Sequence, residues 1–303
     1  MTHPFYRLAV IKTEDGNLTV VERNGKLVPL PLLLEGTNDN PCWHDLGPLV
    51  EDWATWQARL NEAVAAKSDL FDESAMDAAH ATFALPFSHP GNLICIGANY
   101  HDHVAEMPVP MTPTYPYAFL KPVRNTLRAT GESVEAPRHV KMMDWEAELA
   151  VVIGRACKHV PVEEALDQVA GYINFNDLSA RDWIADRPGV GIDWVLHKGH
   201  DGFAPTGPYF VPAQFIPDPQ DLPVMLTVNG EVKQQSTTGQ MIYGVAEIIA
   251  HLSTIMTLSP GDLIGTGTAA GVGHGRKPPE YLKPGDEVRM EIGSLGMLVT
   301  PVV

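Results

Sequence analysis

The run of residues 143–154 places two glutamates, Glu146 and Glu148, inside a segment that otherwise favours a β-strand. Its apolar part is rich in β-branched residues, which fit a pleated strand well. Alternate side chains of a strand point the same way, so Glu146 and Glu148 share a face, with Cα atoms about 6.6 Å apart. Two like charges on a half-buried face repel each other and are costly to desolvate, and a divalent cation between them removes both penalties. The pattern therefore predicts a metal site.

A third carboxylate is expected close to these two glutamates. The segment 171–177 is predicted to form the next apolar, aromatic-rich strand, and it ends in Asp177. With three carboxylates and no Cys or His placed to join them, the predicted ion binds through oxygen only. The alternative is that Glu146 and Glu148 merely line the solvated face of an edge strand.

Composition limits the classes of partner. The chain has 303 residues and 45% hydrophobic content, enough for a large core. Its 37 Asp and Glu against 21 Lys and Arg give a net charge of −16, which argues against nucleic acid and anionic membranes as partners. A small anionic molecule can still bind where a metal and a few cations reverse the local field.

Compartment and domain organisation follow from simple patterns. The three cysteines are far apart and lack a Cys-x-x-Cys spacing, which predicts free thiols in a reducing compartment. With no apolar leader and no apolar run of membrane length, the expectation is a soluble, cytoplasmic protein. The breaker-rich stretch 85–92 predicts a boundary between a small N-terminal domain, residues 1–88, and a larger domain, residues 89–303.

The N-terminal segment is predicted to mix strands and helix. Residues 6–30 alternate apolar and polar positions around turn signals at Asp15-Gly16 and Asn24-Gly25, which is typical of an antiparallel meander. Residues 49–64 then carry apolar side chains at helical spacing.

Strands joined by turns dominate the larger segment, which predicts a mostly β roll or sandwich with few helices. Residues 241–256 form the main helix, with Ile255 on its apolar face. The glycine-rich stretch 265–273 has the wrong spacing for a dinucleotide loop, and the Pro-Pro that follows it cannot open a helix. Either this stretch presents backbone N–H groups and the Thr268 hydroxyl to a carboxylate, or it is a plain flexible loop.

His103 and Glu106 lie three residues apart on a short helical segment, residues 99–107. On one face of a helix, the carboxylate can hold the imidazole in one tautomer and raise its basicity. This predicts a general base with its orienting partner, and the alternative is a solvated surface pair. A rival hypothesis is a β-roll oxygenase that binds iron through His101, His103 and a later Glu, although the two histidines fall on opposite sides of a helical turn.

Five motifs together resemble the fumarylacetoacetate hydrolase family, and they cover residues 91–303 nearly without interruption. They are Ile-Gly-x-Asn-Tyr-x-x-His-x-x-Glu at 96–106, Asp-Trp-Glu-x-Glu-Leu-Ala-Val-Val-Ile-Gly at 144–154, Asn-Asp-Leu-Ser-Ala-Arg-Asp at 176–182, Lys-Gly-His-Asp at 198–201 and Leu-x-Pro-Gly-Asp-Leu-Ile-Gly-Thr-Gly-Thr at 258–268.

The resemblance implies an α+β, mostly β fold, a mixed β-roll or β-sandwich of the family's C-terminal type behind a small N-terminal α+β domain. It also implies a homodimer and a Mg²⁺ or Mn²⁺ ion, with Ca²⁺ as a substitute in vitro. The site residues that it implies are metal ligands Glu146, Glu148 and Asp177, catalytic residues His103, Glu106 and Lys198, and substrate contacts Arg181 and Thr268. One departure is Ile184, where some members carry Gln.

The expected activity is hydrolysis of a carbon–carbon bond in a 1,3-diketo acid of the acylpyruvate or fumarylacetoacetate kind. The resembling family also contains 2-oxo acid decarboxylases, hydratases and isomerases that use the same enolate-stabilising site. The His–Glu pair favours a water-activating hydrolase among these, and a non-catalytic binder of acidic ligands is a further alternative. Because residues 99–107 form too short a helix to be stable alone, we expect them to act as a lid that brings His103 over the metal.

Overall fold

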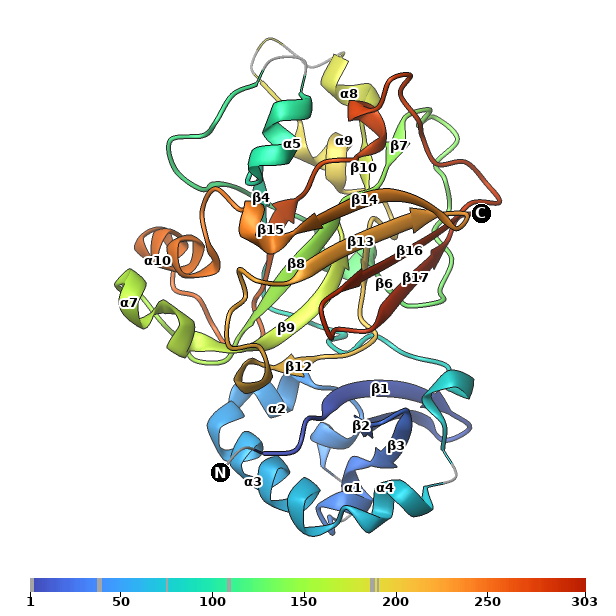
Figure 1. Ribbon diagram of the computed structural model, residues 1–303, viewed down its shortest axis with the longest axis vertical. Coiled ribbons are helices and arrows are strands. Elements are labelled where there is room, and N and C mark those ends of the chain that lie inside the picture. Colours follow the sequence, from blue (N-terminus) through green and yellow to red (C-terminus); the bar gives the residue numbers. More distant parts are fainter. Residues whose placement is uncertain (1–2, 37–39, 75, 108–109, 186–188, 190) are drawn as a thin grey trace.

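The computed structural model describes residues 3–36, 40–74, 76–107, 110–185, 189 and 191–303 (Figure 1). A large β-rich body stands on a smaller layer formed by the first part of the chain. The expected mostly β, α+β class is confirmed. Within the described residues, no helix combines the length and apolarity that a membrane crossing requires.

The N-terminal layer contains the predicted antiparallel meander. Asn24 and Gly25 both have positive φ, 53° and 81°, as a tight two-residue hairpin turn requires. The predicted helix 49–64 is divided at Asp52, whose φ of −130° is not helical. The elements of this layer are β1 (Arg7–Thr13), β2 (Gly16–Arg23), β3 (Lys26–Pro29), α1 (Leu30–Leu33), η1 (Pro41–Trp43), α2 (Gly47–Glu51), α3 (Trp53–Ala66), α4 (Asp69–Glu73) and η2 (Ala78–His80).

A mixed sheet runs through the centre of the body in the order β5-β4-β15-β8-β9-β11-β6, and β12 pairs with β9 at one end. The predicted Glu-x-Glu strand is β8, and its antiparallel neighbour β9 is the predicted aromatic-rich strand. The bounds are β4 (Leu93–Gly97), β5 (Tyr117–Leu120), β6 (Leu127–Ala129), β8 (Ala147–Ile153), β9 (Val169–Asn176), β11 (Ala204–Thr206), β12 (Val211–Pro212) and β15 (Leu263–Thr268).

A second, antiparallel sheet packs against the first in the order β14-β13-β16-β17. Turns occur at Asn229-Gly230 and at the two Pro-Gly-Asp tripeptides, 260–262 and 284–286, with Gly261 and Gly285 at positive φ of 84° and 97°. The strands are β13 (Pro223–Val228), β14 (Glu231–Thr237), β16 (Glu287–Ile292) and β17 (Met297–Pro301), and a separate short pair is β7 (Met143–Asp144) with β10 (Ser179–Ala180).

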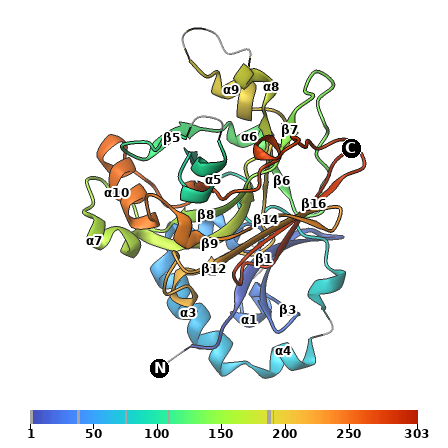
Figure 2. The same cartoon turned by 45° about the horizontal axis from the view of Figure 1, so that its top comes forward.

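Short helices lie around the sheets. Helices α8 and α9 lie at the end of the molecule opposite the N-terminal helices (Figures 1 and 2). The prediction for Ile255 is wrong: it is the last residue of α10 and is 64% exposed. The bounds are α5 (His101–Glu106), α6 (Val123–Thr126), α7 (Val162–Ala165), η3 (Leu166–Gln168), α8 (Asp182–Ala185), α9 (Trp194–Lys198), η4 (Ala213–Phe215), η5 (Thr238–Gln240), α10 (Val245–Ile255) and η6 (Gly273–Gly275).

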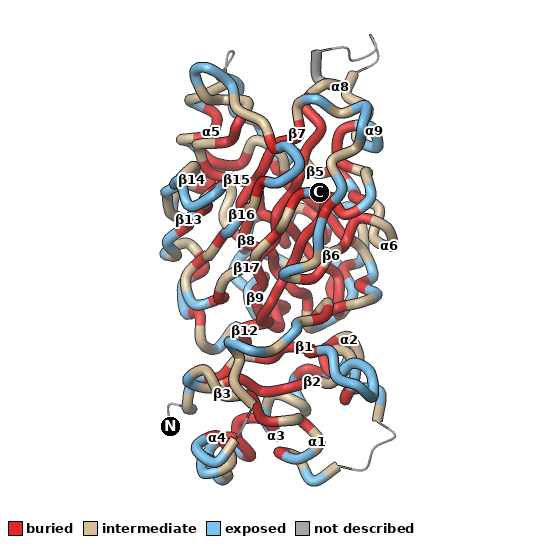
Figure 3. Tube along the Cα trace, turned by 90° about the vertical axis from the view of Figure 1, so that its right-hand side faces the viewer, coloured by how far each residue is buried: buried red, intermediate tan, exposed pale blue. Residues whose placement is uncertain are grey.

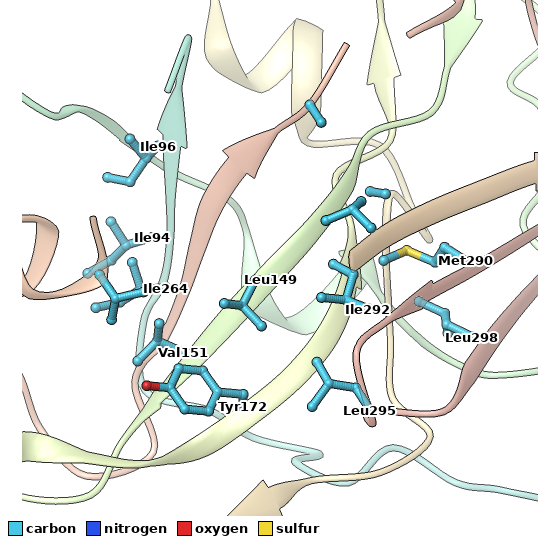
Figure 4. Close-up of a cluster of buried hydrophobic side chains, with 14 of the residues drawn as sticks. Ile94, Ile96, Leu149, Val151, Tyr172, Ile264, Met290, Ile292, Leu295 and Leu298 are labelled. Carbon is cyan, nitrogen blue, oxygen red and sulfur yellow. The ribbon is translucent and has the colours of Figure 1, made fainter. Parts of the chain in front are cut away.

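Strand β8 is buried on both faces, as the red trace through the middle of Figure 3 shows. Leu149 and Val151 point into the core between the two sheets (Figure 4). Ala150 and Val152 point the other way, into a cluster shared with the N-terminal layer. This explains the continuous apolar run of the strand. Because the two parts share a core, the domain boundary after residue 88 stays a prediction.

Candidate active site

The three predicted metal ligands meet at one end of the central sheet. Glu146 precedes β8, Glu148 lies in β8, and Asp177 follows β9. The Asp177 N–H donates to the Glu146 carbonyl at 3.0 Å, which holds the two strand ends side by side. One carboxylate oxygen from each residue lies within 4.8 Å of the others, and all three residues are buried. The alternative of a solvated edge strand is therefore wrong.

Crowding of these carboxylates perturbs their protonation. Burial, together with the charges of Asp177 and Glu146, raises the pKa of Glu148 well above its usual range. Burial opposes ionisation of Glu146 as well, but Lys198 and Arg181 hold the pKa of Glu146 below its usual range. Converging buried carboxylate oxygens are the donor set that hard divalent cations prefer. The residues present thus fit a divalent ion, whose charge would allow Glu148 to ionise.

Lys198 lies inside this carboxylate cluster. Its Nζ donates to Glu146 at 2.7 Å and to Asp177 at 2.6 Å. These carboxylates outweigh burial and raise the pKa of Lys198. The ammonium thus stays charged beside the predicted ligands, where it can stabilise negative charge that develops on a bound substrate.

Two further charged groups of the site were missed from sequence. Lys121 is 2% exposed and donates to Asp177 and to the Leu178 carbonyl. Asp144 is fully buried, and it accepts hydrogen bonds from Arg181 and from the backbone N–H groups of Trp145, Gly273 and His274. Both had a local signal: Asp144 stands two residues before Glu146, and Lys121 stands between the apolar run 117–120 and a proline.

The two predicted substrate contacts already have protein partners. Arg181 donates from Nε to Asp144 at 2.8 Å and from Nη2 to Glu146 at 2.5 Å. The Thr268 hydroxyl donates to the Ala147 carbonyl at 2.9 Å and accepts from Gln234 at the same distance. Both residues line the pocket, but in this structure they mainly orient the neighbouring groups.

The predicted His–Glu pair is formed. His103 Nδ1 lies 2.7 Å from Glu106 Oε1, and because a carboxylate accepts, the ring proton is on Nδ1. His103 is 5% exposed and lines the same pocket as the carboxylate triad, so the hypothesis of a solvated surface pair is wrong. Its Nε2 is then free to act as a base. His101 is exposed, so the two histidines do not converge as iron ligands would.

The glycine-rich stretch donates backbone N–H groups to carboxylates, and these carboxylates are protein side chains. Gly267 donates to Glu148 at 3.0 Å, and Gly271 donates to Glu106 at 2.8 Å. At Gly265, a Cβ atom would lie 2.5 Å from Glu148 Oε2, so a side chain would displace the predicted ligand. The plain flexible loop is therefore not what the structure contains.

The predicted lid segment is seated over the site. The Asn99 side chain donates to the carbonyls of Tyr243 and Thr266, and Asp102 accepts from Ser236 at 2.6 Å. The segment is thus hydrogen-bonded to the body with His103 lining the pocket, and its movement as a lid stays a prediction. Pro108, which follows this segment, lies outside the described residues.

A pocket of about 170 Å³ connects the triad, His103 and Lys198 with an aromatic wall. Trp194 stacks on Phe119 with ring centroids 4.1 Å apart and an angle of 4°. Helix α9 begins at Trp194 and is capped by Asp193, whose side chain accepts from the N–H groups of Val195 and Leu196. The Ile184 side chain lies outside the described part. The apolar lining residues are Ile96, Met107, Tyr117, Phe119, Ile192 and Trp194.

Residues 92–303 match the family model described as fumarylacetoacetate (FAA) hydrolase C-terminal. The chain belongs to this family. The segment with the carboxylate triad, the His–Glu pair and Lys198 is thus the family's C-terminal domain, and the chain is an enzyme of a family with hydrolase and isomerase-type members.

Two curated relatives and one solved structure show the range of activities named within the family. The chain is 43% identical to human mitochondrial oxaloacetate tautomerase FAHD2B over 222 residues, 73% of this chain and 69% of that protein. It is also 43% identical to 2,4-didehydro-3-deoxy-L-rhamnonate hydrolase of a Sphingomonas strain over 215 residues, 71% and 74% of the two chains. The fumarylpyruvate hydrolase of Pseudomonas aeruginosa, solved with Mn²⁺ and pyruvate, is 32% identical with a TM-score of 0.64, over 71% and 90% of the chains.

Proposed function

We propose that this protein is a divalent-metal-dependent hydrolase that cleaves the carbon–carbon bond of a small 2,4-dioxo acid of the acylpyruvate kind. The observation that carries the proposal is the buried His103–Glu106 pair, which lines the same pocket as the carboxylate triad. A base beside an oxygen-only metal site is the combination that water activation and enolate stabilisation require.

The residues divide the reaction between them. A Mg²⁺ or Mn²⁺ ion held by Glu146, Glu148 and Asp177 would supply Lewis-acid stabilisation of the oxygens at the pyruvyl end. His103 Nε2 removes a proton from water, and Glu106 stabilises the imidazolium that forms. The hydroxide adds to the distal carbonyl, and the bond between C3 and C4 breaks. The His103 imidazolium then returns the proton to C3, so that water and the dioxo acid give a carboxylic acid and pyruvate.

The lining of the far wall of the pocket favours a substrate with an uncharged acyl group. The cations that line the described pocket are Lys198 and Arg181, and both are bonded to the carboxylate cluster. The remaining wall is largely apolar and aromatic. The pocket, at about 170 Å³, is smaller than the roughly 300–1,000 Å³ of pockets that bind drug-sized ligands. This difference favours a short substrate.

A tautomerase is the second candidate, because one 43% identical relative is named an oxaloacetate tautomerase. For that reaction His103 would move a proton between C3 and the enol oxygen of a 2-oxo acid, and no water would be consumed. The same dyad and metal site serve both reactions, so the substrate panel must separate them.

Acetylpyruvate and oxaloacetate, incubated in parallel with Mg²⁺-loaded protein and followed by proton NMR, provide the test. The hydrolase proposal predicts equal amounts of acetate and pyruvate from acetylpyruvate, and none after chelation with EDTA. Faster exchange between the keto and enol forms of oxaloacetate, with acetylpyruvate intact, would reject hydrolysis in favour of the tautomerase. Turnover at the same rate after chelation would contradict the metal site in both candidates.

A further inference from the structure

His197 is a buried polar residue that the proposed reaction does not use. It lies on α9 between Trp194 and Lys198, and these three side chains share one face of the helix because they are three and four residues apart. His197 is 3% exposed and lines the same pocket as the carboxylate triad. Its ring packs on Trp194 with centroids 5.6 Å apart and an angle of 25°. The imidazole is thus part of the aromatic wall.

Among the described residues, neither ring nitrogen of His197 has a hydrogen-bond partner. Buried polar groups in folded proteins nearly always have partners, and leaving one unpaired is unfavourable. Both ring nitrogens are buried in this conformation, and a half-turn of the ring about the Cβ–Cγ bond places them where ring carbon atoms now lie. A group that enters the pocket is the natural partner for this ring.

The charge state of His197 defines which group that is. Burial, reinforced by the nearby positive charges of Lys198 and Arg181, lowers the pKa of His197 to about 2. A neutral imidazole offers one donor and one acceptor, which matches a hydroxyl group, and its donor alone matches a carbonyl. A carboxylate has no proton for the acceptor nitrogen, and a neutral ring supplies no charge to balance it.

We propose that His197 selects the distal end of the substrate, and that it does so by hydrogen-bonding an uncharged hydroxyl or carbonyl group on the acyl chain of a 2-oxo acid. This inference rests on the proposed function only in that the pocket binds a 2-oxo acid at the carboxylate triad. The substrate class is then a short hydroxylated or oxygenated oxo acid, rather than one with a terminal carboxylate or a plain alkyl chain.

Binding of unreactive 2-oxo acids tests this inference separately from catalysis. Calorimetry on the Mg²⁺-loaded protein would compare 2-oxopentanoate, 4-hydroxy-2-oxobutanoate, 5-hydroxy-2-oxopentanoate and 2-oxoglutarate. We expect one hydroxy acid to bind about tenfold or more tightly than the alkyl and dicarboxylate compounds, a difference in the range of one good hydrogen bond. In His197→Phe, which keeps an aromatic ring without nitrogens, this preference should fall to within about twofold.

Two further variants separate recognition from packing. His197→Asn restores a donor and an acceptor near the Nδ1 position and should recover part of the hydroxyl preference. His139→Phe, at an exposed histidine outside this pocket, should keep the wild-type preference. An equal preference in wild type and His197→Phe, or tightest binding of 2-oxoglutarate by the wild type, would overturn the proposal.

Kinetics extend the test to the reacting substrate. If acetylpyruvate and its 5-hydroxy analogue are both hydrolysed, His197→Phe should raise KM for the hydroxy compound and leave KM for acetylpyruvate within about twofold. If neither is hydrolysed, the proposed hydrolase activity is wrong. The calorimetric preference still decides the role of His197 in that case, because binding of the oxo acids needs no turnover.

Discussion

The backbone N–H of Gly271 donates to Glu106 at 2.8 Å, although the two residues are 165 positions apart. The other oxygen of the same carboxylate holds His103 Nδ1 at 2.7 Å. The orientation of the imidazole therefore depends on the glycine-rich segment after β15 as well as on α5. Gly273 in that segment donates to Asp144, which in turn holds Arg181 against Glu146. One chain of hydrogen bonds thus connects the proton-transfer pair to a predicted metal ligand.

Replacing the proposed base should separate turnover from metal binding. We expect His103→Ala to lower kcat by about 10²–10⁴-fold, the usual contribution of general-base assistance. Its Mg²⁺ affinity, measured by calorimetry, should stay within a few-fold of the wild type, because His103 is not one of the three carboxylate ligands. His101→Ala is the matched control, since His101 is exposed on the same helix. Near-normal kcat in His103→Ala would remove the pair from the mechanism.

Glu148→Gln should abolish stabilisation by metal and leave the fold intact. A ligand at 100 times its Kd adds about 2.7 kcal/mol to the free energy of unfolding, so wild type should gain in Tm with Mg²⁺ and the variant should not.

The raised pKa of Glu148 means that the metal-free wild type loses stability as the pH rises above the ordinary range of a glutamate. Metal-free Glu148→Gln should therefore be at least as stable as wild type at pH 8.

Thermal melts with and without Mg²⁺ measure both effects in one experiment. Glu135→Gln, at an exposed glutamate, should behave as the wild type in each condition. A full Mg²⁺ shift in Glu148→Gln would exclude Glu148 as a ligand.

Lys121→Met should destabilise the protein much more than the loss of a surface ion pair. Asp177 and Lys121 are both buried, and breaking a buried pair costs up to about 3–5 kcal/mol. Because Lys198 still donates to Asp177 in this variant, the expected loss lies toward the lower end of that range. Lys12→Met breaks the exposed pair of Lys12 with Glu132, for which about 1 kcal/mol or less is expected. Urea unfolding of the metal-free proteins measures both. Similar losses in the two variants would show that Lys121 does not compensate Asp177.

The lowered pKa of His197 predicts a specific pH dependence of stability. In the unfolded chain, His197 gains a proton below the ordinary histidine pKa of about 6.5. In the folded chain its pKa is about 2, so the ring stays neutral over this range. The free energy of unfolding should therefore fall by up to about 1.4 kcal/mol per pH unit as the pH drops from 6.5 toward 4.5. His197→Phe should show a flatter profile in this window when urea unfolding is measured in EDTA. Parallel profiles would mean that the folded protein protonates His197.

Closure of residues 99–107 should depend on substrate. The helical part of this segment, α5, is short, so its order depends on hydrogen bonds such as those of Asn99 and Asp102 to the body. Amide hydrogen exchange across the segment should slow when oxalate, a non-hydrolysable analogue, binds the Mg²⁺-loaded protein. Strong protection without oxalate, unchanged by its addition, would make the segment a fixed wall. Ser236→Ala, which removes the contact to Asp102, should speed exchange in the ligand-free state.

Local periodicity was sufficient to predict much of the site. Side chains two apart in a strand share a face, which brings Glu146 and Glu148 together, and three-residue spacing on a helix pairs His103 with Glu106. Turn residues such as Asn24-Gly25 likewise identified their hairpin, because few residues adopt positive φ. These features depend on neighbours within a few residues, so the sequence by itself determined them.

Only the tertiary structure decided which groups compensate one another across the sheet. Lys121 meets Asp177 from 56 positions away, and Asp144 holds both Arg181 and the segment at Gly273. Within the described part of the chain, His197 packs on Trp194 and has no hydrogen-bond partner, and nothing in its local sequence predicts this burial. Hydrogen bonds and charge compensation act over a few ångströms in space, whatever the separation along the chain, so they follow from strand order and packing rather than from local sequence.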